Sequence, residues 1–265
     1  MAVGLPQYQV QILLAIGLLG VYAGWRGGMQ KMAGFYDMPN ATKHLAFGLV
    51  MGAFSGILID GLFIEWVAEL GAVPLESIGL MIFLGLLQAL VFHFLLTREG
   101  VRMLRAPPTS GWTMGLGMGA IQASYLMIRM ADPNWPGIVS GFNIQMILFG
   151  ILITACMPAL EAIIGSWQGS AVVEKKPMSV LWQAGIFRSM ILIVVLLGIT
   201  SQPIFLIVLP PAVLYGFSIA EDKWLPSALI PSVRQEYERT LRKASKRKKQ
   251  RENREVGEIV LDSEE

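Results

Sequence analysis

Long apolar stretches separated by short polar breaks occupy the first 220 residues of the chain. A helix needs about 20 mainly apolar residues, with a range of roughly 17–25, to cross a hydrocarbon core about 30 Å thick. Seven stretches fit that length: 8–25, 44–64, 78–97, 111–130, 138–160, 180–199 and 204–220. The pattern predicts an all-α integral membrane protein, with a bundle of about seven transmembrane helices that forms one domain over residues 1–222.

Composition supports a membrane protein and excludes several other classes. Only 15% of the 265 residues are charged and the mean hydropathy is +0.56, whereas an average soluble domain is about 25% charged. The single cysteine, Cys156, excludes a disulfide framework and a multi-cysteine zinc or iron–sulfur site. The sequence also lacks a phosphate-binding loop motif, and no cofactor is predicted.

The basic residues indicate an orientation. The linkers after the first, third and fifth stretches hold eight of the ten Lys and Arg residues that precede position 223. The opposite linkers are acidic, and Arg129 is their only basic residue. Because cytoplasmic loops are enriched in Lys and Arg, the alternation predicts an external N-terminus, a cytoplasmic C-terminal tail and a multi-pass location in the cell membrane.

Four ionisable residues within the stretches are candidates for function: Asp60, His93, Glu161 and Arg188. Charged groups inside a bilayer are costly, so each of them needs a partner or a role. The predicted ends of the stretches place the last three residues about 7–9 Å below the cytoplasmic surface. Glu161 and Arg188 could form an ion pair between adjacent helices, or Glu161 could carry a proton or cation while Arg188 controls its affinity.

Asp60 lies in the outer third of its stretch. It could conduct cations from the outer side, or it could bond a neighbouring polar residue such as Gln122, Asn143 or Gln145.

Two histidines and one acid offer a metal alternative. His44, His93 and Glu161 have the ligand types of a zinc site, but their spacing matches no metal motif. A lone histidine near a helix end more often forms hydrogen bonds at the interface. The metal hypothesis therefore requires three different helices to bring these side chains together.

Glycines recur every four residues in two stretches, at positions 48, 52 and 56 and at positions 111, 115 and 119. Such spacing lets helices approach closely in a membrane. It predicts tight packing within the bundle, or a contact face for a protein partner or a second copy.

Residues 223–265 form a tail that is first basic and then acidic. Ser232 and Gln235 match a capping box, which predicts a tail that is partly helical and otherwise disordered. Its basic residues are expected to bind anionic lipid headgroups, although nucleic acid, a ribosome or an acidic protein would attract the same charges. These residues are Arg242, Lys243, Lys246, Arg247, Lys248, Lys249 and Arg251.

The sequence leaves three classes of function open. A transporter or channel for a small solute or ion is favoured, with Asp60 or the Glu161 and Arg188 pair in the path. The alternatives are a non-catalytic membrane scaffold or assembly subunit, and a membrane-embedded enzyme that is metal-dependent through His44, His93 and Glu161.

Overall fold

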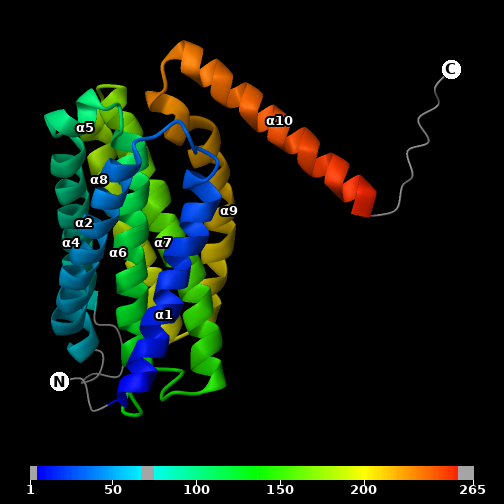
Figure 1. Cartoon of the computed structure of the whole chain (residues 1–265). Coiled ribbons are helices and arrows are strands. Elements are labelled where there is room, and N and C mark those ends of the chain that lie inside the picture. The colour runs from blue at the N-terminus through cyan, green and yellow to red at the C-terminus, as the bar shows by residue number, and fades with distance from the viewer. Residues whose placement is uncertain (1–4, 67–74, 136, 256–265) are drawn as a thin grey trace.

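The structure is a computed structural model that describes residues 5–66, 75–135 and 137–255. All regular elements in this part of the chain are helices (Figure 1). The long ones are α1 (Gln7–Gly24), α2 (Met38–Ile59), α4 (Leu75–Leu96), α6 (Pro107–Met130), α7 (Ile144–Val173), α8 (Pro177–Thr200), α9 (Leu209–Ile219) and α10 (Pro231–Glu255).

Short helical segments extend or connect these helices. Three are π-helical turns at the ends of α1, α2 and α9, namely η1 (Trp25–Met29), η2 (Asp60–Ile64) and η4 (Ala220–Trp224). The others are α5 (Glu99–Met103) and the 3₁₀ turns η3 (Pro203–Val208) and η5 (Leu225–Ala228).

Six helical segments in the described residues are long and apolar enough to cross a membrane. They are Gln7–Met29, Met38–Ile64, Ser77–Leu96, Ile144–Val173, Pro177–Thr200 and Pro203–Ala228. The remaining predicted stretch is α6, which has 24 residues but carries glycine, serine and threonine where the other helices carry leucine and isoleucine. The chain is therefore confirmed as an all-α protein with several helices suited to a membrane.

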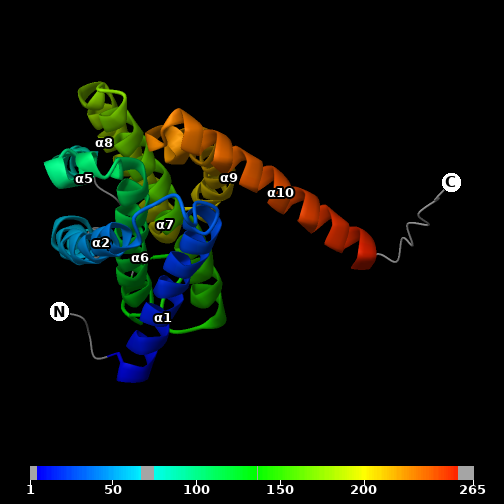
Figure 2. The ribbon, with the colours of Figure 1, turned by 45° about the horizontal axis from the view of Figure 1, so that its top comes forward.

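α6 is the central helix of the bundle. It packs mainly on α7 and α2, with α1 on a third side, and most of its residues are buried (Figures 1 and 2). Trp112 on α6 is fully buried and donates a hydrogen bond to the carbonyl oxygen of Gly24 at 3.3 Å. Small residues on α6 let the backbones of the neighbouring helices approach closely, which accounts for its composition.

The two glycine stripes serve packing inside this chain. A Cβ at Gly48 would collide with the backbone of Met114 on α6. A Cβ at Gly111 would collide with the backbone of Gly165 on α7, and one at Gly115 with the backbone of Glu161. Of the two roles that the sequence left open for these faces, the structure shows packing within the bundle, so they are not available to a partner.

The fifth stretch differs most from its predicted bounds of 138–160. α7 begins at Ile144, because Gly141 has a left-handed φ of +80° and Asn143 caps the helix by accepting a hydrogen bond from Met146 N–H at 2.9 Å. The helix then continues to Val173. Glu161 does not end the helix, since its charge is neutralised by a neighbouring helix.

This extension changes the predicted position of the charged residues along their helices. Glu161 lies twelve residues before the end of α7 and Arg188 lies eleven residues after the start of α8. At 1.5 Å per residue both are about 16–18 Å from their helix ends, about twice the distance of 7–9 Å that the predicted stretch ends gave. His93 lies only three residues before the end of α4, so the three residues differ in their distance from a helix end, and their depth in a bilayer stays a prediction.

The prolines of the last stretch lie at the start of a helix. Pro210 and Pro211 occupy the first turn of α9, where 3₁₀ geometry changes to α geometry. Proline is tolerated in a first turn because its missing N–H would have no partner there.

Candidate functional site

The interior of the bundle contains the predicted pair of opposite charges. Glu161 on α7 and Arg188 on α8 form an ion pair, and their side chains are 2% and 0% exposed. The ion pair predicted from the sequence is thereby confirmed, whereas a role for Glu161 in carrying a proton or cation stays a prediction.

Further groups from α4 and α7 surround Arg188. Its Nη2 donates a hydrogen bond to Gln168 Oε1 at 3.0 Å, and its guanidinium lies 3.9 Å from the centre of the Phe92 ring. Gln168 Nε2 donates in turn to the carbonyl oxygen of Ala89 at 3.0 Å. Arg188 therefore joins α4, α7 and α8, and we call these four side chains (Glu161, Gln168, Arg188 and Phe92) the arginine clasp.

Two members of the clasp, Gln168 and Phe92, were not predicted from the sequence. Gln168 lies seven residues after Glu161, which is two helical turns and hence the same face of α7. That spacing was a usable signal for Gln168. Phe92 had no such signal, because its position over Arg188 depends on how α4 packs against α8.

Asp60 has a second ion pair, at the opposite end of the bundle from α10. It binds Arg129 of α6 and accepts a hydrogen bond from the Tyr125 hydroxyl at 3.1 Å. Asp60 therefore bonds neighbouring polar side chains, as one alternative predicted, but these are Tyr125 and Arg129 rather than the amides of Gln122, Asn143 or Gln145. Tyr125 and Arg129 are four residues apart on one face of α6, so Arg129, the lone basic residue on the acidic side, was the better candidate.

The structure does not bring the two histidines to Glu161. His44 is buried and its Nδ1 donates to the carbonyl oxygen of Asn40 at 2.8 Å. The His93 ring packs beside Phe94, with 6.0 Å between ring centres. Among the residues that the structure describes, no three His, Cys, Asp or Glu side chains are grouped so that they could hold a metal ion, so the geometry gives the metal hypothesis no support.

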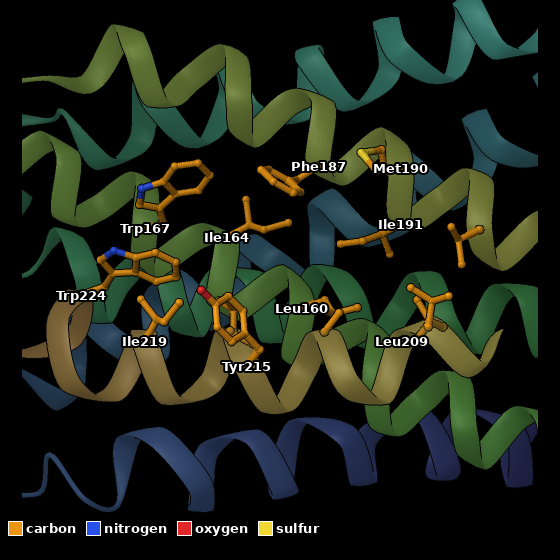
Figure 3. A pocket seen from close by; sticks show the side chains of 15 residues that line it. Leu160, Ile164, Trp167, Phe187, Met190, Ile191, Leu209, Tyr215, Ile219 and Trp224 are labelled. Carbon is orange, nitrogen blue, oxygen red and sulfur yellow. The ribbon is translucent and has the colours of Figure 1, made fainter. Parts of the chain in front are cut away.

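An apolar cavity of about 310 Å³ lies between α7, α8 and α9 (Figure 3). Its walls include Leu160 and Ile164 of α7, Phe187 and Ile191 of α8, and Leu209 of α9. The lining is almost wholly apolar. The cavity was not predicted from the sequence, because each of the three helices contributes only a few ordinary apolar residues to it.

Aromatic rings close one end of the cavity. The indoles of Trp167 and Trp224 stack with 5.6 Å between ring centres and 20° between planes. Phe187 packs edge-on against Trp167 at 5.9 Å (Figure 3).

The cavity opens sideways between α8 and α9. The segment η3 packs on α8, whereas α9 packs mainly on α7, so α8 and α9 separate beyond η3. At the opening, Met190 is 52% exposed and Tyr215 is 74% exposed. In a membrane, this opening would face lipid rather than water.

The arginine clasp and the cavity share a wall. Leu160 and Ile164 precede and follow Glu161 on α7, and Phe187 and Ile191 stand in the same relation to Arg188 on α8. The clasp lies on the α4 side of the α7–α8 seam and the cavity lies on the α9 side. The ion pair therefore holds together the two helices that form most of the cavity wall.

The tail helix α10 is attached to the bundle by its first turns only. Tyr237 is 3% exposed and packs edge-on against Phe35 at 5.4 Å. Burial, together with Glu221 and Asp222, raises the pKa of Tyr237 to about 12. Nearby, Lys31 Nζ binds both carboxylate oxygens of Glu221 at 2.7 Å, which joins the first linker to η4.

Beyond Leu241 the helix carries no large apolar residue up to its end at Glu255. The basic side chains that the structure describes there are exposed, namely those of Arg242, Lys243, Lys246, Arg247, Lys249 and Arg251. The side chains of Lys248 and Arg254 lie outside the described part of the chain. The acidic residues after position 255 also lie outside the described residues. The predicted disorder falls on this same part of the tail. The helix confirms a partly helical tail, and it begins at Pro231.

Comparison with known proteins yields no relative: no protein family, no curated protein and no solved structure matches this chain significantly.

Proposed function

We propose that this protein is a carrier for a small apolar solute, which it takes from the bilayer into the cavity between α7, α8 and α9. The observation that carries the proposal is the apolar, laterally open cavity of about 310 Å³. Small-molecule sites typically have volumes of about 300–1,000 Å³ and mainly apolar linings.

Solute recognition would depend on shape and ring contacts rather than on charge. A solute that enters from lipid is already out of water and gains no hydrophobic free energy in an apolar cavity, so the selective contacts would be van der Waals packing against the walls and the flat aromatic end formed by the stacked indoles of Trp167 and Trp224. The lateral opening gives a solute dissolved in lipid direct access.

The charged residues support this class of solute better than an ion. Glu161 and Arg188 are bound to each other, and Arg188 also to Gln168, in closed packing against α4. Arg188 Nε is buried without a hydrogen-bond partner, but each charge of the pair is neutralised by the other, and a neutralised charge is a weak carrier for a second ion. We assign the clasp the role of holding α7 and α8 together as the cavity wall.

The other two classes lose part of the support that the sequence gave them. The glycine faces that a scaffold would offer to partners are occupied by helices of the same chain. The enzyme alternative required His44, His93 and Glu161 to converge, and within the described chain they form no such group.

The proposal includes seven spans in the cell membrane, with the N-terminus outside. α6 runs alongside α2 and α7 over their length (Figure 1), so a bilayer crossed by those helices is crossed by α6 too. The linkers after α1, α4 and α7 gather at the end from which α10 leaves (Figures 1 and 2), and these are the basic linkers. Reporter fusions after Arg105, Lys176 and Lys243 should be cytoplasmic and a fusion after Asp132 external; any other result contradicts this topology.

We assign α10 to the inner membrane surface. The helix slants outward, away from the bundle, rather than continuing its long axis (Figures 1 and 2), and beyond Leu241 it has charge but no apolar face. A peptide covering residues 232–254 should bind anionic vesicles and should not bind neutral ones. Added salt should weaken the binding to anionic vesicles. Equal binding to both vesicles would contradict the proposal, and salt-dependent binding to RNA alone would favour a nucleic-acid or ribosome contact.

Cavity occupancy can be tested by photolabelling the purified protein with a diazirine-bearing hydrocarbon. Labelling should concentrate on lining residues such as Met190 and Tyr215. Ala212→Trp, which places an indole in the cavity, should remove this labelling. Leu214→Trp is the matched control, since Leu214 lies two residues away on α9, is 74% exposed and does not line the cavity.

Transport itself needs vesicles that contain the protein. A fluorescent apolar probe should cross these vesicles faster than empty ones, and Ala212→Trp should abolish the difference while Leu214→Trp retains it. Cavity labelling without any acceleration would reduce the proposal to a binding protein. Equal labelling of Ala212→Trp and Leu214→Trp would show that the solute does not bind in the cavity.

A further inference from the structure

A second hollow, of about 740 Å³, lies between α1 and α2 at the end of the bundle that carries the basic linkers. It is separate from the apolar cavity and shares no lining residue with it. Here α1 packs on α6 and α7 while α2 packs on α6. The two helices thus leave a groove between them, which we call the α1–α2 groove.

The lining of the groove changes character along its length. Leu18 and Val21 of α1 and Leu45 of α2 form an apolar part, whereas Arg26 and Gln30 form a polar part beside the first linker. Arg26 lies eight residues after Leu18, which corresponds to about 12 Å along a helix. A phospholipid has the same arrangement of an apolar and a polar part, with its chains at bilayer depth and its phosphate at the surface.

The polar part has the charge that a phosphate requires. None of the residues that line the groove is acidic, and Arg26 forms no ion pair within the described part of the chain. Arg26 Nη1 donates to the Tyr22 hydroxyl at 3.1 Å, which directs the side chain while leaving most of its N–H groups unused. Guanidinium groups with free N–H groups bind phosphate oxygens in pairs.

Two aromatic rings flank the polar part. Trp25 and Tyr36 pack edge to face, with 6.3 Å between ring centres, and burial raises the pKa of the Tyr36 hydroxyl. Trp and Tyr concentrate at the headgroup level of membranes. The rings therefore mark the same depth as Arg26.

We infer that the α1–α2 groove binds one anionic phospholipid, with a chain along Leu18, Val21 and Leu45 and its phosphate at Arg26 and Gln30. This inference is independent of the proposed solute carrier, because the groove and the cavity are separate. It concerns a single bound lipid, whereas the α10 helix would contact a lipid surface.

The test is native mass spectrometry of the full chain in detergent, with phosphatidylglycerol added. In the reference protein Lys246, Arg247 and Lys249 are changed to Gln, so that α10 contributes little. One phosphatidylglycerol should bind in preference to phosphatidylcholine. Arg26→Gln should weaken that binding about tenfold or more, because a hydrogen bond to a charged group is lost.

Two controls keep the result specific. Arg98→Gln removes a charge from the same end of the bundle but outside the groove, and should leave binding unchanged. Gln30→Leu should weaken binding by a smaller factor while the Arg26 charge remains. Glycerol phosphate, which has no chains, should bind far more weakly than the lipid.

Unchanged binding in Arg26→Gln would overturn the inference, as would equal losses in Arg26→Gln and Arg98→Gln. Glycerol phosphate that binds as well as the lipid would show a phosphate site without a chain groove, and would overturn it too. Thermal unfolding of each variant establishes that it is folded before binding is compared.

Discussion

Two ion pairs of the same chemistry lie in different surroundings in this bundle. In the arginine clasp both charges are almost fully buried and Arg188 has further partners from α4 and α7. In the Asp60–Arg129 pair the side chains are 17% and 13% exposed, and Tyr125 supplies the one additional hydrogen bond. The clasp joins three helices in the middle of the bundle, whereas the outer pair joins α2 to α6 near one end.

The difference in burial predicts how much stability each pair loses when one of its charges is removed. A buried charge that loses its partner retains its full desolvation penalty, while a charge near the surface can still reach water or headgroups. Removing one charge of the clasp should therefore lower the free energy of unfolding strongly, and removing both charges should lower it less. The outer pair should tolerate the loss of either charge.

Breaking the clasp should have the largest effect. Glu161→Gln and Arg188→Met should each reduce the free energy of unfolding by about 3–5 kcal/mol, and the double change should recover part of that loss. Thermal unfolding in detergent measures all three variants against the wild type. Additive losses in this double-mutant cycle would contradict a direct coupling, and an unchanged fold with abolished pH-dependent cation uptake in Glu161→Gln would restore the ion-carrier hypothesis.

Removing the amide from the clasp comes next. Gln168→Leu keeps the volume and the ion pair but leaves one Arg188 N–H and the Ala89 carbonyl without their partner. A loss of about 1.5–3 kcal/mol in unfolding free energy is expected, since one of the two bonds involves a charge. A neutral effect would mean that the ion pair alone joins α7 and α8.

The outer pair should give a smaller effect under the same assay. Asp60→Asn removes the charge but keeps the shape, and should cost about 1–2 kcal/mol because Arg129 remains partly exposed. A loss as large as that of Glu161→Gln would show that exposure does not distinguish the two pairs.

The smallest change isolates one hydrogen bond of the outer pair. Tyr125→Phe removes the hydroxyl that donates to Asp60, with an expected loss of about 0.5–1.5 kcal/mol. Combined with Asp60→Asn, the two losses should be less than additive, because both changes act on the same contact. Strict additivity would place the Tyr125 contribution elsewhere.

Local patterns were sufficient for the helices and for one of the two ion pairs. Apolar length located each stretch, with the largest differences at the start of α2, which begins six residues before the predicted stretch, and at both ends of α7, where the boundary depended on the Asn143 cap and on charge neutralisation at Glu161. The Glu161–Arg188 pair could be predicted because the two residues lie on consecutive helices joined by a short linker. The Asp60–Arg129 pair joins helices that are not consecutive, and it was missed.

The sequence by itself determined that the chain is helical and suited to a membrane, and where its charges and glycines lie, because hydrophobic length and residue spacing are properties of single helices. Only the tertiary structure decided which helices meet. It enclosed α6, used the glycine stripes inside the chain, kept His44 and His93 away from Glu161, and left the cavity and the α1–α2 groove open. Such features depend on the relative positions of several helices, and close packing sets those positions through contacts between residues far apart in the chain.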